Sequence, residues 1–334
     1  MTDACAGGKV LAAAAATLAY PETFRERDRW IVARRGSRNT LDPLEAYGAF
    51  VEDERTESGD VVPVATLLLT NRECPWRCLM CDLWKSTLDS DTPRGAIPRQ
   101  IERALERLSP ASRIKLYNAG SLFDPRAVPP EDDAEIARLV SGFDRVIVES
   151  HPALVGPRCL EMNERLDGRL EVAMGLETVH PDVLPRLNKG MTLADFDAAA
   201  QRLRDSGIPA RAFVLAGLPF VPAREQLAWT LASIGRAFEA GAGAVSVIPT
   251  RSGNGAMEAL LALGQFETPP LALLEDAVAL GVGLGRGRVF ADLWDLAGFS
   301  RCDACLPGRT DRLRTINLTQ SVPPPVRCAC SAAS

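Results

Sequence analysis

The stretch Val64-Ala-Thr-Leu-Leu-Leu-Thr-Asn-Arg-Glu-Cys74-Pro-Trp-Arg-Cys78-Leu-Met-Cys81 decides how the rest of the chain is interpreted. Its apolar first part is typical of a buried strand. Its second part places three cysteines in the spacing C-x3-C-x2-C, so the strand delivers three thiols to one tight loop. Thiolates are soft ligands that suit zinc or iron-sulfur clusters. A four-iron cluster normally takes four thiolates, so three leave one iron open, as a catalytic metal requires.

Length and composition fit a globular α/β protein. The chain has 334 residues, of which 46% are hydrophobic, and a net charge of -5 with a pI near 5.4. This acidity argues against a surface coated in basic residues for non-specific nucleic-acid binding, although a local basic pocket stays compatible with it. No apolar run reaches the roughly 18 residues that span a bilayer, and the alanine-rich residues 10–20 predict a helix. We expect a cytoplasmic protein with no membrane partner.

The nine cysteines form two groups and two single residues. Clustered cysteines in a large intracellular chain more often bind metal than form disulfides. The second group has the count for a tetrahedral zinc site or an auxiliary iron-sulfur cluster, with unligated surface cysteines as the alternative. This group consists of Cys302, Cys305, Cys328 and Cys330. Of the two single residues, Cys5 is expected to be incidental and Cys159 to lie in the core.

From Val64 onward, short β-rich runs alternate with helical patterns. The predicted strands are 64–70, 113–118, 144–149, 169–175, 210–216 and 243–248. The predicted helices between them are 96–108, 131–141, 157–166, 192–206 and 223–240. Two further helices are expected near 255–263 and 270–282, followed by a flexible glycine linker at 281–285.

Repeated βα units predict a parallel sheet with helices outside it. Six units favour a partial (β/α)6 barrel of the TIM type, with a doubly wound open sheet as the alternative. The expected organisation is an N-terminal extension over 1–62, a core barrel over 63–255, and a C-terminal extension over 256–334 with the second cysteine group. In such barrels, chemistry gathers on the loops after the carboxyl ends of the strands, where the cysteine loop falls.

Two further motifs support a family resemblance. Gly175-Leu-Glu177-Thr follows the fourth predicted strand, and Gly217-Leu-Pro219 follows the fifth. Together with the cysteine loop they resemble the radical S-adenosylmethionine (SAM) enzymes, over roughly residues 64 to 250. The resemblance implies a partial (β/α)6 barrel, in agreement with the strand count.

The resemblance also implies a cofactor and a reaction. SAM would chelate the open iron of a [4Fe-4S] cluster held by Cys74, Cys78 and Cys81. Reductive cleavage would then give methionine and a 5'-deoxyadenosyl radical that takes hydrogen from substrate. An electron donor such as flavodoxin or ferredoxin is the implied partner.

Several residues match SAM-binding positions of the family. Glu177 matches a position that contacts the ribose hydroxyls, for which a carboxylate is a strong acceptor. Lys189 falls where relatives often place an arginine near the SAM carboxylate, and it supplies the charge without the bidentate fork. Gly217 belongs to the cofactor-binding set as well.

Two positions depart from the family pattern. Many members carry Gly-Gly-Glu after the second strand, where this chain has Asn118-Ala-Gly-Ser121, so Asn118 and Ser121 are the candidate substitutes. The position before the third cysteine is commonly aromatic and touches adenine, but here it is Met80. Trp84 is a candidate for the missing aromatic plane.

A narrower resemblance is to the group that contains the archaeal radical SAM subunit of archaeosine synthesis, which acts on a lysine-modified deazaguanine base in tRNA. It is carried by Thr70-Asn-Arg-Glu-Cys74, Leu116-Tyr-Asn-Ala-Gly120 and residues 248–257. A modified tRNA base is therefore a candidate substrate.

Other polar residues are candidates for chemistry or binding. Glu149 and His151 end the third predicted strand at the active-site face and are candidates for proton transfer. Arg251 and Asn254 follow the sixth strand and are candidates for substrate binding. Residues 34–38 carry three arginines that either grip an anionic substrate or form a solvated loop.

The sequence predicts a radical SAM enzyme whose net reaction is open among carbon-nitrogen cleavage, methylthiolation and other rearrangements. The alternative from a different class is a non-catalytic iron-sulfur or zinc protein that senses redox state or scaffolds a partner. A third interpretation is a partner subunit in tRNA modification.

Overall fold

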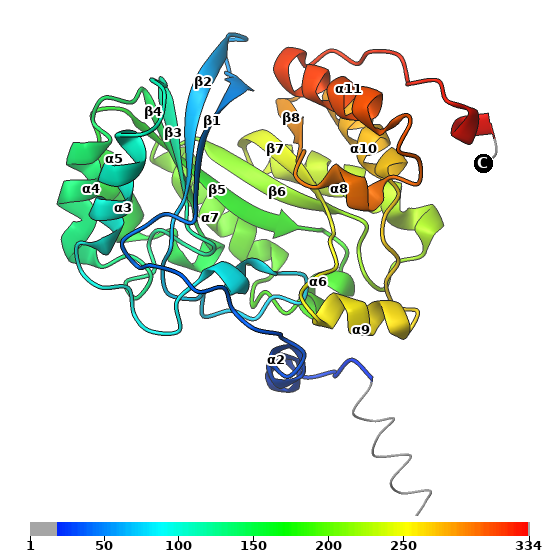
Figure 1. Cartoon of the computed structure of the whole chain (residues 1–334), viewed down its shortest axis with the longest axis horizontal. Coiled ribbons are helices and arrows are strands. Elements are labelled where there is room, and N and C mark those ends of the chain that lie inside the picture. The colour runs from blue at the N-terminus through cyan, green and yellow to red at the C-terminus, as the bar shows by residue number, and fades with distance from the viewer. Residues whose placement is uncertain (1–18, 333–334) are drawn as a thin grey trace, which may run out of the picture.

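The computed structural model of the chain describes residues 19–332 (Figure 1). Within that range the strands form one eight-stranded sheet in the order β1 to β8, curled into a half-barrel. The strands are β1 (Gly48–Arg55), β2 (Val61–Leu68), β3 (Arg113–Tyr117), β4 (Arg145–Glu149), β5 (Arg169–Glu177), β6 (Ala210–Ala216), β7 (Ala242–Pro249) and β8 (Arg288–Ala291).

The sheet is parallel from β2 to β8, and β1 pairs antiparallel with β2. The partial α/β barrel predicted from the sequence is confirmed, and its six strands are β2 to β7. Strand order follows chain order without reversal, which excludes the doubly wound alternative. The sheet has one further strand at each edge, β1 and β8, and both lie outside the core barrel expected over residues 63–255.

Most of the helices cover the outside of the sheet, whereas α2 and α9 lie beyond one end of its strands (Figure 1). They are α2 (Phe24–Val32), α3 (Ala96–Leu105), α4 (Asp133–Leu139), α5 (Pro157–Arg165), α6 (Val183–Arg186), α7 (Leu193–Asp205), α8 (Gln226–Glu239), α9 (Ala256–Ala262), α10 (Leu271–Gly283) and α11 (Leu306–Thr319). In the described part of the chain, none combines the length and hydropathy needed to cross a membrane.

Local sequence explains where these helices lie. α7 starts at a capping box, in which Thr192 Oγ1 accepts from the Asp195 amide at 3.2 Å and the Asp195 carboxylate accepts from the Thr192 amide at 2.7 Å. α3 buries Ile97 and Ile101, one turn apart, against the sheet. Cys159 of α5 lies in the same core, as expected.

Three expectations from the sequence need correction or fall outside the described residues. Residues 281–285 are not a linker throughout, because α10 continues to Gly283. The alanine-rich helix over 10–20 falls mostly outside the described residues, as does Cys5, and Ala19 and Tyr20 are not helical.

α11 closes the gap between the two edges of the sheet, because it contacts both β1 and β8. Asn317 and Gln320 use their side-chain amides to pair with the backbone of β8. Asn317 Oδ1 accepts from the Ala291 amide at 2.7 Å and Gln320 Oε1 from the Val289 amide at 2.7 Å. The edge strand is thereby satisfied without a further strand, which protects it from pairing with another chain.

A buried ion network fills the barrel near the amino ends of its parallel strands. The guanidinium of Arg211, on β6, binds Glu54 of β1 at 2.6 and 2.9 Å and Glu171 of β5 at 3.0 Å. Lys115 of β3 adds a contact of 2.7 Å to Glu54. Burial favours the neutral form of Glu54, but Arg211 and Lys115 outweigh it and hold the pKa of Glu54 well below its usual range.

Replacing Arg211 should therefore weaken the whole barrel. Arg211→Met leaves two buried carboxylates without their main partner, and breaking such a pair costs about 3–5 kcal/mol of unfolding free energy. Arg138→Met is the matched control, because Arg138 pairs with Glu135 on the surface, where a pair contributes about 0–1 kcal/mol. Urea unfolding measures both; equal losses in the two variants would contradict a structural role for the network.

Candidate active site

The cysteine loop follows β2 and is held in place by residues far away in sequence. The Leu79 amide donates to Leu187 O at 2.9 Å, and Asn254 Nδ2 donates to Leu79 O at 2.7 Å and to Cys81 O at 3.2 Å. Asn254 Oδ1 in turn accepts from the Met257 amide at 2.8 Å. All hydrogen-bonding atoms of this side chain are thus engaged, and the structure places Asn254 as a support of the cysteine loop.

Glu73, beside the first cysteine, ties the N-terminal segment to this loop. Its carboxylate binds Arg35 at 2.6 Å, Arg77 at 3.0 Å, and Arg38. The arginines of residues 34–38 therefore include two that neutralise the protein's own carboxylate. The third, Arg34, lies over the ring of Trp30 with its guanidinium carbon 3.5 Å from the ring centre.

The three thiols of the loop lie in a desolvated environment. Burial raises the pKa of Cys74, Cys78 and Cys81 to about 12 in each case. The charge of Lys189 opposes this rise at Cys74 and Cys78. Without a metal the thiols stay protonated, so a bound cation must supply the charge that makes them thiolates.

A buried ion pair lies beside the thiols. Lys189 Nζ binds Glu177 Oε1 at 2.6 Å, and both charges act on Cys78. Glu177 has a φ of 63° at a shift in the β5–β6 register, which turns its side chain out of the strand pattern. Gly175 makes room, since a Cβ there would lie 2.1 Å from Glu177 Oε1 and 2.2 Å from Lys189 Nζ.

The loop after β3 lies directly against Cys74. A Cβ on Gly120 would come within 3.2 Å of Cys74 Cβ, a tight contact that glycine avoids. Within the described residues, the Oδ1 and Nδ2 atoms of Asn118 are buried without a hydrogen-bond partner. Ser121 Oγ lies 3.1 Å from Ser150 Oγ. An unsatisfied buried side-chain amide, in a loop that packs against Cys74, is the feature expected where a polar ligand completes a site.

Glu149 supports this loop from β4. One of its carboxylate oxygens accepts a hydrogen bond from the backbone amide of Asn118 at 3.0 Å. Burial raises the pKa of Glu149 to about 7, against the opposing effect of the Asn118 and Ala119 amides and of Lys189. The side chain is therefore poised to exchange a proton near neutral pH, in keeping with its candidacy for proton transfer.

His151 is held on both ring nitrogens. Nδ1 accepts from the Ala153 amide at 3.2 Å, so Nε2 carries the proton and donates to Lys189 O at 3.0 Å. The ring stacks on Trp76 with centroids 3.5 Å apart. Burial, followed by the charge of Lys189, lowers the pKa of His151 to about 4, so the ring is neutral at pH 7. These contacts make His151 a positioning residue for Lys189.

The remaining cofactor candidates occupy different surroundings. Met80 packs with the apolar clusters around Leu79 and Leu187. Trp84 is buried in the short turn Leu83–Ser86, with the Arg35 guanidinium carbon 4.8 Å from its ring centre, so Arg35 lies over one face of the indole. Gly217 has a φ of 85°, and a Cβ there would lie 2.5 Å from Pro269.

Arg251, the other substrate candidate, has a protein partner. Its guanidinium binds Asp292 at 2.7 Å, beyond the end of β8. Sequence reasoning missed Trp76, Glu73 and Asn188, all of which position the site. Asn188 has a φ of 56° and donates to Arg77 O at 3.0 Å. Asn and Gly favour such turns, so the sequence Asn188-Lys-Gly190 was the signal that could have indicated this turn.

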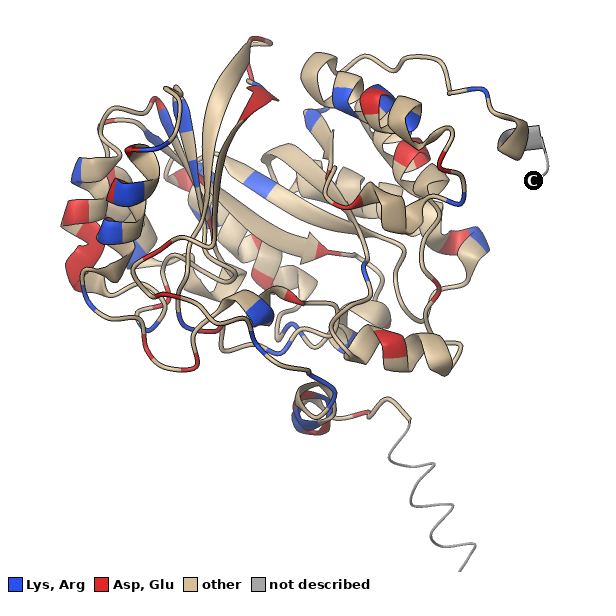
Figure 2. Cartoon of the chain, viewed as in Figure 1, with Lys and Arg blue, Asp and Glu red and all other residues tan. Residues whose placement is uncertain are grey.

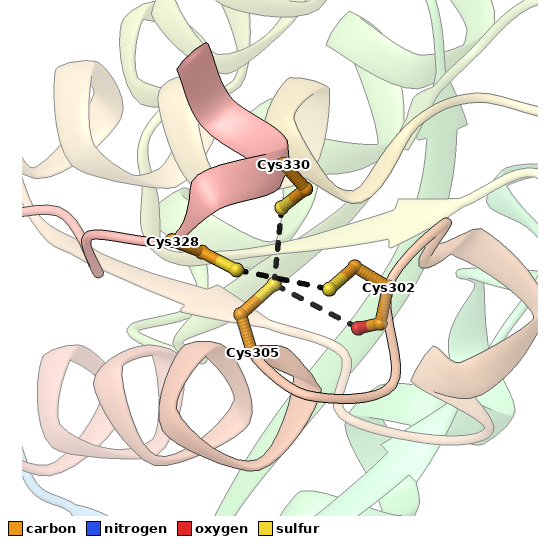
Figure 3. Close-up of side chains that lie close together, drawn as sticks. All are labelled: Cys302, Cys305, Cys328 and Cys330. Carbon is orange, nitrogen blue, oxygen red and sulfur yellow. Dashed lines mark hydrogen bonds between the residues drawn. The ribbon is translucent and has the colours of Figure 1, made fainter. Parts of the chain in front are cut away.

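The C-terminal cysteines form a second cluster of thiols (Figure 3). Cys302, Cys305, Cys328 and Cys330 place their sulfurs within 4.8 Å of one another. Two loops contribute one pair each: the first precedes α11 and the second follows it.

The fold and site define an α/β half-barrel with three thiols and a buried Glu–Lys pair at the carboxyl edge of its parallel strands. Residues 68–227 match the family model of the radical SAM superfamily. This segment, just under half of the chain, carries a radical SAM domain, and the chemistry of that superfamily implies SAM and a [4Fe-4S] cluster.

Curated relatives include two archaeal proteins. The chain is 26% identical over 276 residues to the archaeosine synthase subunit beta of Methanosarcina acetivorans, covering 77% of this chain and 79% of that one. It is 29% identical over 157 residues to the subunit of the same name from Thermococcus kodakarensis, covering 44% of this chain and 48% of the relative. Among solved structures, methylornithine synthase aligns over 85% of this chain and 76% of its own, with 13% identity and a TM-score of 0.49.

The raised pKa of Glu149 predicts a pH dependence of stability. Its folded pKa of about 7 exceeds the ordinary 4.5, so the folded state holds the proton more tightly than the unfolded chain. Wild-type stability should therefore fall as pH rises from about 4.5 to 7, by about 2–3 kcal/mol relative to Glu149→Gln.

Urea unfolding of the metal-free protein at pH 5 and pH 8 checks this. Glu135→Gln is the control, since the pKa of that exposed carboxylate is lowered by Arg138 and it does not titrate in this range. A wild-type minus Glu149→Gln difference that stays constant with pH would show that Glu149 is ionised throughout.

Proposed function

We propose that this chain is a radical SAM enzyme that binds a [4Fe-4S] cluster through Cys74, Cys78 and Cys81 and cleaves SAM reductively. The observation that carries the proposal is the convergence of these thiols with the Glu177–Lys189 pair on one edge of the barrel. When bound, the cluster supplies the electron that cleaves SAM to methionine and a 5'-deoxyadenosyl radical, which takes hydrogen from substrate.

The buried ion pair suits a zwitterionic ligand with a ribose. Lys189 offers a positive charge to the carboxylate of SAM, and Glu177 offers an acceptor to the ribose hydroxyls. In the free protein the two side chains neutralise each other, so neither is left as an unpaired buried charge. Asn118 contributes an unsatisfied side-chain amide from the loop whose Gly120 lies against Cys74, and this amide can meet the polar end of the ligand.

Two sets of contacts hold Lys189 and Asn118 in position. His151 fixes the backbone of Lys189 through its carbonyl, and Trp76 stacks on the imidazole from within the cysteine loop. Glu149 accepts a hydrogen bond from the backbone amide of Asn118 and, near neutral pH, can take or give a proton. The cysteine loop, the Lys189 turn and the loop after β3 are therefore coupled through named contacts. A reductant such as flavodoxin or ferredoxin would supply the electron.

Anaerobic reconstitution tests the radical SAM assignment. Wild-type protein should take up four irons at the first cysteine group and yield 5'-deoxyadenosine from SAM upon reduction. Cys78→Ala should abolish both, because two thiolates do not hold the cube. Cys159→Ala is the control, since this buried thiol lies in the core away from the site. If Cys78→Ala formed as much 5'-deoxyadenosine as wild type, the radical SAM assignment would be wrong.

A modified tRNA base is the substrate class that we favour. The similarity to archaeosine synthase subunits beta supports it, and so does one surface feature. α2 packs beside the Lys189 turn, where Asn188 Nδ2 donates to Asp28 at 2.8 Å. The same helix exposes Phe24, Arg25 and Arg29, a combination of charge and aromatic surface suited to RNA. Figure 2 shows basic and acidic positions intermixed on α2.

Charge reversal on α2 tests RNA binding. Arg25→Glu with Arg29→Glu should weaken binding of bulk tRNA at least about tenfold and flatten its salt dependence, because each arginine that meets a phosphate releases counterions. Arg138→Glu with Arg314→Glu, at exposed pairs on other helices, is the matched control. Unchanged tRNA affinity in the α2 variant, or no tRNA binding by wild type, would overturn the RNA proposal and leave SAM cleavage untouched.

A further inference from the structure

The C-terminal thiols have the spacing of ligands around a single ion. Cys302 Sγ lies 3.8 Å from Cys328 Sγ, and Cys305 Sγ lies 3.7 Å from Cys330 Sγ. All four sulfurs fall within 4.8 Å of one another (Figure 3). Four sulfurs placed 2.3 Å from one central ion in a tetrahedron are roughly 3.8 Å apart.

This spacing discriminates against an iron-sulfur cluster. A cluster distributes its thiolates over different irons, which are joined through bridging sulfides, so thiolates on different irons stand farther apart than ligands of one ion. The first cysteine group shows the contrast. Among the described residues, the C-terminal four are the only set of three or more potential ligands that meets the 4.8 Å limit, and Cys74, Cys78 and Cys81 do not.

The four cysteines also lie where a cross-link would have a structural effect. Cys302 and Cys305 precede α11, and the chain after α11 turns back along it. Arg312 Nε donates to Pro323 O at 2.9 Å, and a Cβ on Gly308 would lie 3.5 Å from Val326. The returning segment, residues 321–330, thus follows α11 from its end to its start. There Cys328 and Cys330 meet the first pair of thiols.

We propose that Cys302, Cys305, Cys328 and Cys330 bind one zinc ion, which fastens residues 321–330 along α11. Four thiolates fill a tetrahedral zinc site completely, and a closed site of this kind is structural rather than catalytic. Each thiol loses its proton when the ion binds. The guanidinium of Arg309 lies beside Cys305 and offsets part of the resulting negative charge.

The consequence reaches the barrel, because α11 is the element that joins β1 to β8. Its outer side is held by Arg309, whose Nε donates to Glu275 of α10 at 2.8 Å. Zinc adds a second restraint at the start of the same helix. The site therefore stabilises the closure between the two edges of the half-barrel.

Metal analysis of the full chain, purified and reconstituted without oxygen, tests the proposal. We expect one zinc per chain in addition to four irons. Cys328→Ser with Cys330→Ser should lose the zinc and keep the four irons, whereas Cys159→Ala should keep both metals. Cobalt(II) supplied in place of zinc should give the visible bands of a tetrahedral thiolate site in wild type and not in the double variant.

Limited proteolysis gives a readout that is independent of metal content. Loss of zinc, by chelator or in the double variant, should speed cleavage within residues 321–330 at least about tenfold, while Cys159→Ala should be cut as slowly as wild type.

Eight irons and no zinc would show an auxiliary cluster. One iron with a mononuclear ferric-thiolate spectrum would show a different ion, and metal-free chains with two disulfides would show covalent pairs. Each of these results would overturn the zinc proposal, and because the four irons are counted separately, none would bear on SAM cleavage.

Discussion

The buried contact between Arg211 and the carboxylates of Glu54 and Glu171 is the interaction on which the curled sheet depends. In the described sheet β1 forms ladder pairs with β2 alone, yet Glu54 on β1 reaches Arg211 on β6, four strands beyond β2. Charges buried this deeply are stable only when paired, so the network penalises any flattening of the sheet that would separate them. Figure 2 shows acidic positions on β1 and basic positions on the strands within the curve of the sheet. Curvature in turn determines which loops can meet at the opposite end.

At that opposite end, curvature converts neighbouring loops into one site. The cysteine loop follows β2, while Glu177 ends β5, three strands away, and a flat sheet would hold them apart. In the half-barrel Glu177 and Lys189 act electrostatically on Cys78. The thiols are half-buried and protonated, and the nearby charges of Glu177 and Lys189 cancel in a pair. The free site thus avoids an unpaired buried charge and still keeps groups for a charged ligand.

Sequence patterns predicted what is local and missed what depends on distant partners. The strand over 210–216 matches β6 because an apolar run is bounded by Pro209 and Gly217. β1 was missed because Glu52 and Glu54 break the apolar pattern, and their partners lie on other strands. The grouping of the three thiols with Glu177 follows from parallel topology, since carboxyl ends share one edge. Parallel topology does not predict the stacking of Trp76 on His151 or the three ion pairs of Glu73, because nothing local in the chain specifies those contacts.

The supporting roles found for Asn254 and Arg251 change where substrate recognition should be sought. Both side chains bind groups of the protein: Asn254 binds the cysteine loop, and Arg251 binds Asp292. The side of the half-barrel near β8 is thus occupied by internal contacts and by α11, which spans to β1. Charged and aromatic groups exposed beside the cysteine loop come instead from α2, which the sequence offered only as part of a mixed N-terminal extension. Because α2 packs on the same turn that carries Lys189, a substrate bound there would lie next to the Glu177–Lys189 pair, which we propose binds SAM.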